Sequence, residues 1–167
     1  MSGIPPSALA RHAFVAGLPA DYVALLAAAA TDVSFPAGYR LFEEGGPAQR
    51  CWLIRDGHVA LDMRVPGPAR LLVETLGAGD VIGLSWLVPP REWQFGAEVI
   101  EPTTAFELDG PTVIAHCESD PALGYELIKR LMTVATVRLH ATRIRLLDLY
   151  GRTPAGTARP HRQLREG

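Results

Sequence analysis

The chain has 167 residues and a formal net charge of −2, with 48% hydrophobic and 20% charged side chains. This length is typical of one globular domain, and the near-neutral charge excludes a whole-chain attraction to nucleic acid. No stretch reaches the roughly 18 consecutive apolar residues that a membrane span needs, and Cys51 and Cys117 lack the spacing of a metal or redox motif. We therefore expect one cytoplasmic domain with reduced thiols and no membrane contact.

Two short helices are predicted within residues 7–29. The segment Ser7–Val15 carries apolar residues at helical spacing, and Gly17 supplies a stop. Pro19 opens a second helix at a first-turn position, and Asp21 is favourably placed on its dipole. Both helices are expected to pack on the outside of a sheet.

The pattern of residues 31–109 is that of strands. Turn signals recur at the short intervals typical of an antiparallel roll or barrel. Asp56-Gly57 is the strongest hairpin signal. After it, Val59 and Leu61 alternate with Ala60 and Asp62, as expected for a strand with one face in the core.

Residues 110–150 are predicted to be helical. Asp109 is a cap for a short helix, and Asp120 followed by Pro121 is a well-formed start for a long one. Without a break before Gly151, the second helix would contain roughly 30 residues. One side of it has a heptad pattern of small or apolar residues, namely Ile128, Met132, Ala135, Leu139, Thr142, Leu146 and Leu149.

This stripe has two interpretations. The helix either lies on its own sheet or pairs with a second copy of the chain. We favour a homodimer, because the apolar stripe extends beyond what a roll of this size can cover. Residues 152–167 carry four arginines and one carboxylate without periodicity, and are predicted to form a disordered basic tail.

Several motifs occur in an order that resembles the cyclic-nucleotide-binding domain of catabolite-activator/FNR-type regulators. They are Phe35-Pro36-Ala37-Gly38, Leu41-Phe42, Trp52-Leu53-Ile54, Gly57-His58-Val59, Gly79-Asp80-Val81-Ile82-Gly83, Ala97-Glu98-Val99 and Leu147-Asp148-Leu149-Tyr150-Gly151-Arg152. The resemblance implies a mainly β jelly roll (an antiparallel double-stranded β-helix) with flanking helices and a long C-terminal helix, so the expected domain is residues 1–151.

The resemblance also implies a ligand site after the Gly79-Asp80 turn. In the family, backbone N–H groups there hold a cyclic phosphate, a glutamate accepts from the ribose, and an arginine pairs with the phosphate. Here Leu84 occupies the glutamate's place, Phe95 the arginine's place and Gly96 that of a small hydroxyl residue. Gly83, Ser85 and Ala97 still offer backbone groups.

Four further residues complete the predicted site, each with an alternative role. Arg91 is either a surface charge or a replacement cation, and Arg138 pairs either with a phosphate or with Asp148 or Glu126 of a second subunit. Trp86 and Trp93 either fill the core or form an aromatic wall for a planar ligand. The expected ligand is a cyclic nucleotide or a related small molecule.

Other activities have less support in the sequence. Family transcription factors continue into a winged helix-turn-helix, and the 16 residues after Gly151 are too few for one, so direct DNA binding is not expected. The sequence contains no nucleophile–base pair, phosphate loop or set of metal ligands, so neither a metal site nor catalysis is expected. We therefore predict a non-catalytic sensor subunit with a rewritten pocket. The alternative is a ligand-free scaffold subunit within a larger protein assembly.

Overall fold

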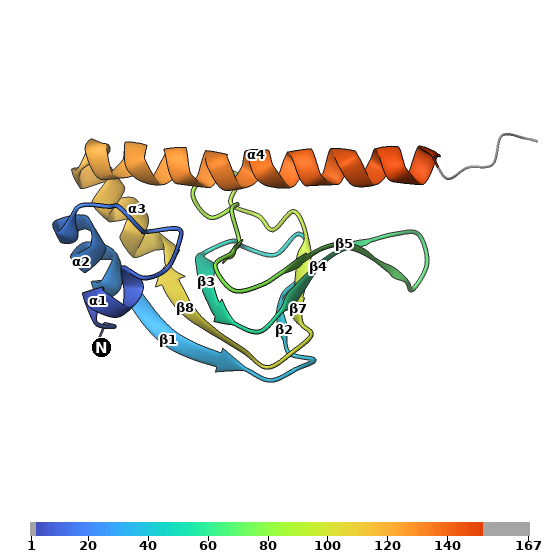
Figure 1. The fold of residues 1–167 in the computed structure, drawn as a ribbon, viewed down its shortest axis with the longest axis horizontal. Coiled ribbons are helices and arrows are strands. Elements are labelled where there is room, and N and C mark those ends of the chain that lie inside the picture. The colour runs from blue at the N-terminus through green and yellow to red at the C-terminus, as the bar shows by residue number, and fades with distance from the viewer. Residues whose placement is uncertain (1–2, 152–167) are drawn as a thin grey trace, which may run out of the picture.

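Two four-stranded antiparallel sheets and one long helix make up the protein in a computed structural model that describes residues 3–151 (Figure 1). The predicted tail, residues 152–167, lies outside the described residues. The helices are α1 (Pro6–Leu9), α2 (Ala20–Ala28), α3 (Gly110–Ser119) and α4 (Pro121–Gly151). The strands are β1 (Ala30–Phe35), β2 (Arg40–Phe42), β3 (Arg50–Asp56), β4 (Val59–Arg64), β5 (Arg70–Leu76), β6 (Val81–Ile82), β7 (Gly96–Val99) and β8 (Thr103–Asp109).

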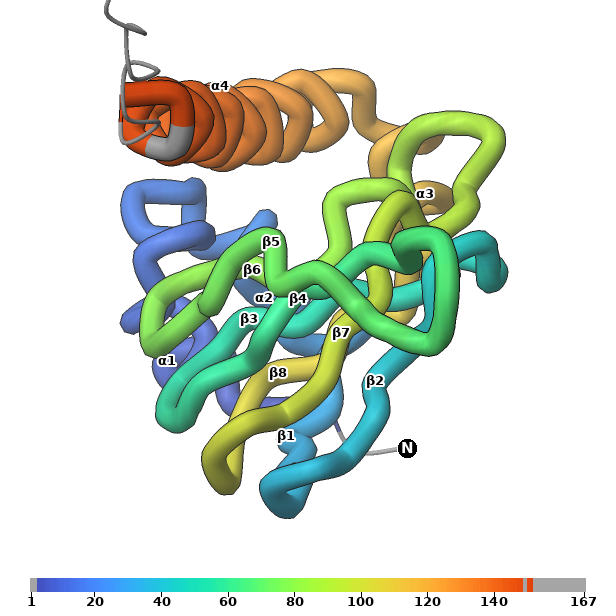
Figure 2. The backbone as a smooth tube through the Cα atoms, turned by 90° about the vertical axis from the view of Figure 1, so that its right-hand side faces the viewer, coloured from blue at the N-terminus to red at the C-terminus, as the bar shows by residue number. Residues whose placement is uncertain are grey.

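The strands pair in the orders β1-β8-β3-β6 and β2-β7-β4-β5, and the tube in Figure 2 shows them wrapping into a roll. Side chains of both sheets and of the helices form one apolar core, in which Leu53, Ile54, Val59 and Val99 are completely buried. This architecture confirms the predicted fold class.

The Asp56-Gly57 turn is not a hairpin, which corrects the prediction from its sequence. It joins β3 to β4, and these strands lie in different sheets. Gly57 has a φ of +91°, and a Cβ on it would lie 2.4 Å from the carbonyl oxygen of Pro102. Glycine is therefore required at position 57 because a neighbouring loop passes against it. The hairpin in this region is the next connection, between β4 and β5.

The N-terminal segment contains less helix than predicted. Helix α1 ends at Leu9, whereas the expected helix was Ser7–Val15. The side chain of His12 explains the difference, because its Nε2 lies 3.0 Å from the carbonyl oxygen of Ile54 and its Nδ1 accepts from the backbone N–H of Phe14. These two hydrogen bonds hold the chain in a turn against β3.

The C-terminal helices begin where the sequence predicts. The carboxylate of Asp109 accepts from the backbone N–H of Thr112 at the start of α3, and that of Asp120 accepts from the N–H of Ala122 at the start of α4. Helix α4 has 31 residues and lies along the whole length of the roll (Figure 1). Its first half is fixed to the core by the buried Leu123, Leu127 and Leu131. Its second half contacts the roll through arginines.

The outer face of the sheet β2-β7-β4-β5 carries a network of ion pairs. The guanidinium of Arg40 is bonded to both carboxylate oxygens of Asp62, and Arg70 Nη1 lies 3.2 Å from Asp62 Oδ1. These hydrogen bonds lower the pKa of Asp62, despite its burial, and raise the pKa of Arg40. The network therefore joins β2, β4 and β5 on the side of the sheet opposite its apolar face.

Candidate functional site

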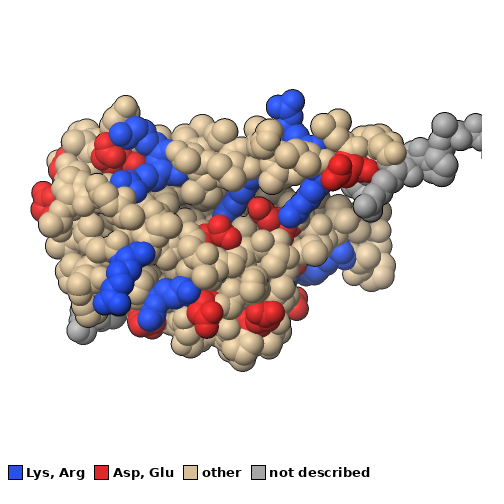
Figure 3. Space-filling model, viewed as in Figure 1, with Lys and Arg blue, Asp and Glu red and all other residues tan. Residues whose placement is uncertain are grey.

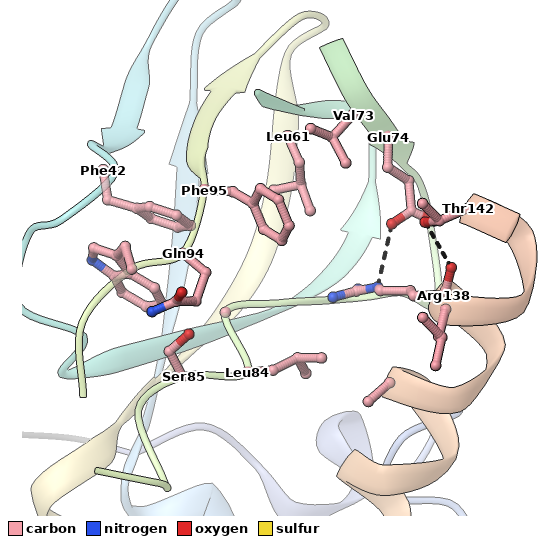
Figure 4. A pocket seen from close by; sticks show the side chains of 14 residues that line it. Phe42, Leu61, Val73, Glu74, Leu84, Ser85, Gln94, Phe95, Arg138 and Thr142 are labelled. Atoms are coloured by element: carbon pink, nitrogen blue, oxygen red, sulfur yellow. Dashed lines mark hydrogen bonds and ion pairs between the residues drawn. The ribbon is translucent and has the colours of Figure 1, made fainter. Parts of the chain in front are cut away.

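A cavity of about 370 Å³ lies between the roll and the second half of α4 (Figure 4). Its lining is mainly apolar and comes from β2, β4, β5, the β6–β7 connection and α4. The residues are Phe42, Leu61, Val73, Glu74, Gly83, Leu84, Ser85, Trp93, Gln94, Phe95, Ala135, Arg138, Leu139 and Thr142. This volume lies within the range of small-molecule pockets.

Aromatic rings form one end of the cavity. The rings of Phe42 and Trp93 are stacked with centroids 3.9 Å apart and planes inclined by 16°. Gly83, with a φ of +83°, permits this arrangement, because a Cβ there would lie 2.8 Å from the Trp93 ring. The ring of Phe95 lies beside this stack in the same cavity (Figure 4).

The cavity lining contains one carboxylate and one guanidinium, and they face each other. Nε of Arg138, on α4, lies 3.6 Å from Oε2 of Glu74, on β5. The Arg138 guanidinium also donates to the carbonyl oxygen of Val81. Both charged side chains are largely buried, 17% exposed for Arg138 and 19% for Glu74. Burial lowers the pKa of Arg138, and the nearby carboxylates of Glu74 and Asp80 oppose this shift.

The structure brings six of the ten sequence-predicted ligand residues into this cavity. They are Gly83, Leu84, Ser85, Trp93, Phe95 and Arg138. In the single chain, Arg138 pairs with the carboxylate of Glu74. The carboxylates predicted from the sequence were instead Asp148 and Glu126 of a second subunit.

Two predicted residues lie elsewhere. Trp86 is 2% exposed, and with Arg91 it lines a separate hollow of about 450 Å³ beside α3. Arg91 adopts a φ of +57° after the Pro89-Pro90 pair. Neither side chain belongs to the residues that line the cavity at α4.

The remaining two, Gly96 and Ala97, are buried in β7 and do not line the cavity. Gly96 accommodates the ion-pair network, because a Cβ there would lie 1.9 Å from Nη2 of Arg40 and 2.7 Å from Oδ1 of Asp62. The absence of a side chain at position 96 thus has a structural explanation that involves no ligand.

Several lining residues were not predicted as ligand contacts. Phe42, Leu61 and Val73 belong to apolar strand positions that suggest only a core, and Glu74 and Gln94 lie in segments without a recognisable motif. Ala135, Leu139 and Thr142 were assigned to the dimer stripe, yet they line the cavity from α4. The helical spacing of these three residues could have predicted their place in the cavity, because they lie next to Arg138 on α4 and Arg138 was itself a predicted ligand residue.

The predicted dimer stripe is largely uncovered in the single chain. Ile128, Met132, Leu139 and Leu146 are 50–63% exposed, and Ala135 is half-buried. Thr142 is exposed, and the side chain of Leu149 lies outside the described residues. The stripe follows α4 beyond the part that the buried leucines hold against the core.

Comparison with known proteins decides the family. Residues 32–120, more than half of the chain, match the model of the cyclic nucleotide-binding domain. The chain belongs to this family. A curated relative is the CRP-like cAMP-activated global transcriptional regulator of Mycobacterium tuberculosis, which is 28% identical over 141 residues. The match covers 84% of this chain and 61% of the regulator, so the chain spans about three fifths of that protein's length.

Solved structures agree with this cyclic nucleotide-binding fold. A Geobacter metallireducens protein assigned to the cyclic nucleotide-binding proteins superposes with a TM-score of 0.75 at 26% identity, covering 82% of this chain and 99% of that one. The catabolite activator protein of Thermus thermophilus superposes with a TM-score of 0.65 at 23% identity over 83% of this chain and 63% of that one. At this level of identity, the similarity to the catabolite activator protein concerns the fold alone.

Two features are absent from residues 3–151. No helix in this part of the chain combines the length and apolar composition needed to cross a membrane. Within the same residues, no three His, Cys, Asp or Glu side chains are grouped so that they could hold a metal ion.

Proposed function

We propose that the chain is a non-catalytic sensor in which a small ligand, bound in the cavity at α4, acts directly on that helix. The observation that carries this proposal is the composition of one cavity wall: Ala135, Arg138, Leu139 and Thr142 all belong to α4. A ligand that fills the cavity therefore contacts β2, β4 and β5 on one side and α4 on the other. Such contacts favour one position of the helix over others, which is a shift of population.

The side chains of the pocket disfavour cyclic AMP as that ligand. Leu84 and Phe95, at the places where the family resemblance implies a glutamate and an arginine, both line the cavity. Losing a charge-assisted phosphate contact costs about 1.5–3 kcal/mol, and a ribose hydroxyl without an acceptor costs about 1–3 kcal/mol more. Together these losses correspond to roughly two to four decades of affinity.

The output of the sensor is a homodimer formed through α4. Met132 is 59% exposed and Leu146 is 50% exposed, so the stripe defined above is free to pair with the same stripe of a second copy. Leu139 lies in both the stripe and the cavity lining. Ligand binding and dimer geometry are therefore coupled through this residue and its neighbours on α4.

The neutral fluorescent molecule N-phenyl-1-naphthylamine tests whether the cavity binds a ligand. We expect saturable binding of one molecule per chain, measured by fluorescence and by calorimetry. Ala135→Phe places a ring in the cavity and should weaken binding by at least about tenfold, which is about 1.4 kcal/mol. Thr136→Phe, at the next and exposed position outside the cavity, is the matched control and should bind as the wild type does.

The alternative function is a scaffold that uses the same fold without a ligand. It is favoured by Val137, Ile144 and Leu147, which are 64%, 47% and 71% exposed on α4 outside the dimer stripe. Apolar residues in such positions are typical of contacts with another protein. Absence of saturable probe binding to the wild-type chain, together with no response to a panel of nucleotides, would support the scaffold over the sensor.

The charge distribution gives no support to a nucleic-acid partner for residues 3–151. On the face shown in Figure 3, Lys and Arg side chains alternate with Asp and Glu over the roll and α4. Several arginines of the described residues are paired with carboxylates, such as Arg50 with Glu107 and Arg55 with Asp32. A phosphate backbone is instead recognised by a continuous basic surface.

A further inference from the structure

We propose that Glu74 makes the cavity at α4 selective for uncharged, mainly apolar ring compounds and excludes ligands that carry a phosphate or sulfonate. This inference rests on the proposed function, since it names the ligand class of the same cavity. It depends on three observations: the charge balance of the lining, the contacts of Arg138 and the position of the aromatic rings.

The charges of the cavity lining cancel. Of the fourteen lining residues, Glu74 and Arg138 are the ionised ones, and Ser85, Gln94 and Thr142 are polar without charge. The other nine are apolar or glycine. A ligand that enters this cavity loses part of its contact with water, and an anion loses far more hydration energy than an uncharged molecule does.

Arg138 is the lining cation that an anion would need, and its charge is already compensated. Its Nε lies 3.6 Å from the Glu74 carboxylate, and its guanidinium donates to the carbonyl oxygen of Val81. An anionic group placed beside Arg138 would also lie close to Glu74, where the two like charges repel in a site that is largely shielded from water. The pair therefore gives an anion little net attraction.

The rest of the lining favours rings. The stacked pair Phe42–Trp93 and the adjacent Phe95 supply aromatic faces and edges. Ser85 and Gln94 lie at the same end of the cavity (Figure 4) and supply hydrogen-bonding groups to a ligand with a polar substituent. Apolar walls with a few polar groups that fix orientation are typical of sites for small organic molecules.

Two probes with the same ring system separate the effect of charge from that of shape. N-phenyl-1-naphthylamine is neutral, and 8-anilinonaphthalene-1-sulfonate adds one sulfonate to it. We expect the wild-type chain to bind the neutral probe at least about tenfold more tightly in a one-to-one complex. In Glu74→Gln, which keeps the shape and removes the charge, Arg138 becomes an uncompensated cation. The affinity for the sulfonated probe, relative to that for the neutral probe, should then rise at least about tenfold.

Matched variants assign the shift to this ion pair. Glu118→Gln removes one exposed carboxylate outside the cavity and should leave the affinity ratio unchanged. The double variant Glu74→Gln/Arg138→Gln should lose the gain in sulfonate affinity. The Ala135→Phe variant identifies any sulfonate bound outside the cavity, such as on the exposed apolar stripe of α4.

The outcomes distinguish this inference from the proposed function. A ratio that changes by less than threefold in folded Glu74→Gln overturns the role of Glu74. If neither the neutral probe nor any nucleotide of the panel binds the wild-type chain, the sensor proposal fails. In that case 8-anilinonaphthalene-1-sulfonate alone tests the role of Glu74. It must still bind Glu74→Gln more tightly than it binds the wild-type chain. If Glu74→Gln does not fold, equal affinities of the wild-type chain for the two probes overturn the inference.

Discussion

Replacement of Asp62 by alanine is expected to lower the free energy of unfolding by about 3 kcal/mol. Asp62 is 10% exposed and accepts hydrogen bonds from Arg40 and Arg70. Removal of one partner from a buried ion pair typically costs about 3–5 kcal/mol, because the other charge stays buried without compensation. We place the effect at the lower end, because Arg40 is 21% exposed and keeps its contact with Glu43. Denaturant titration followed by circular dichroism measures the change.

The control for Asp62→Ala is Asp32→Ala. Asp32 pairs with Arg55 at 2.7 Å, but these two side chains are 56% and 42% exposed. Such a surface pair contributes about 0–1 kcal/mol. Equal effects of the two substitutions would contradict the structural role of the network.

Acid should weaken the Asp62 network in the wild-type chain. The hydrogen bonds from Arg40 hold the pKa of Asp62 below the ordinary carboxyl value. Its contribution to stability is therefore complete above that ordinary value and is lost as the pH falls through the lower, folded-state pKa. The difference in the free energy of unfolding between the wild type and Asp62→Ala should therefore become smaller as the pH is lowered. Denaturant titrations at several pH values measure this difference.

Replacement of Met132 by glutamate is expected to convert the proposed dimer into monomers. Met132 is 59% exposed in the single chain, so the substitution should leave the fold intact. In the dimer it would place two like charges, one from each copy, on the apolar stripe that must be buried. A charge without a partner in such an interface costs several kcal/mol, so the dimer dissociation constant should rise by at least about a hundredfold. Sedimentation equilibrium measures this constant.

Val137 provides the matched position for that test. It is 64% exposed and apolar, but it lies two residues from Leu139 and hence about 160° away around the helix. Val137→Glu should leave the dimer unchanged. Dissociation caused by Val137→Glu and not by Met132→Glu would place the interface on another face of α4.

The sequence predicted those parts of the fold whose signals are local. Asp109 and Asp120 each form the expected cap, and the helix that follows Asp120 has the expected length. The arrangement of the two sheets followed from the order of motifs along the chain. Gly57 shows the limit of local signals. The Asp-Gly pair is typical of a hairpin turn, but glycine is needed at this position because the chain at Pro102, far along the sequence, passes against it.

The sequence predicted part of the cavity lining, including Arg138, but missed its carboxylate. Gly83, Leu84 and Ser85 were found because they follow a recognisable turn motif. Glu74 was missed because its importance depends on Arg138, 64 positions later, which reaches it only when α4 lies over the roll. Gly96 was assigned to the ligand although it accommodates Arg40, whose side chain comes from another strand. Long-range contacts of this kind leave no pattern in one sequence.

Calorimetric titration of the wild-type chain with cyclic AMP shows whether the cavity at α4 binds this nucleotide. We propose that the side chains of this cavity do not hold the nucleotide, although the fold is that of a cyclic nucleotide-binding domain. We predict no saturable heat at micromolar concentrations, since the missing contacts weaken binding by roughly two to four decades. A one-to-one complex with a dissociation constant in the low micromolar range would overturn the proposed loss of nucleotide binding.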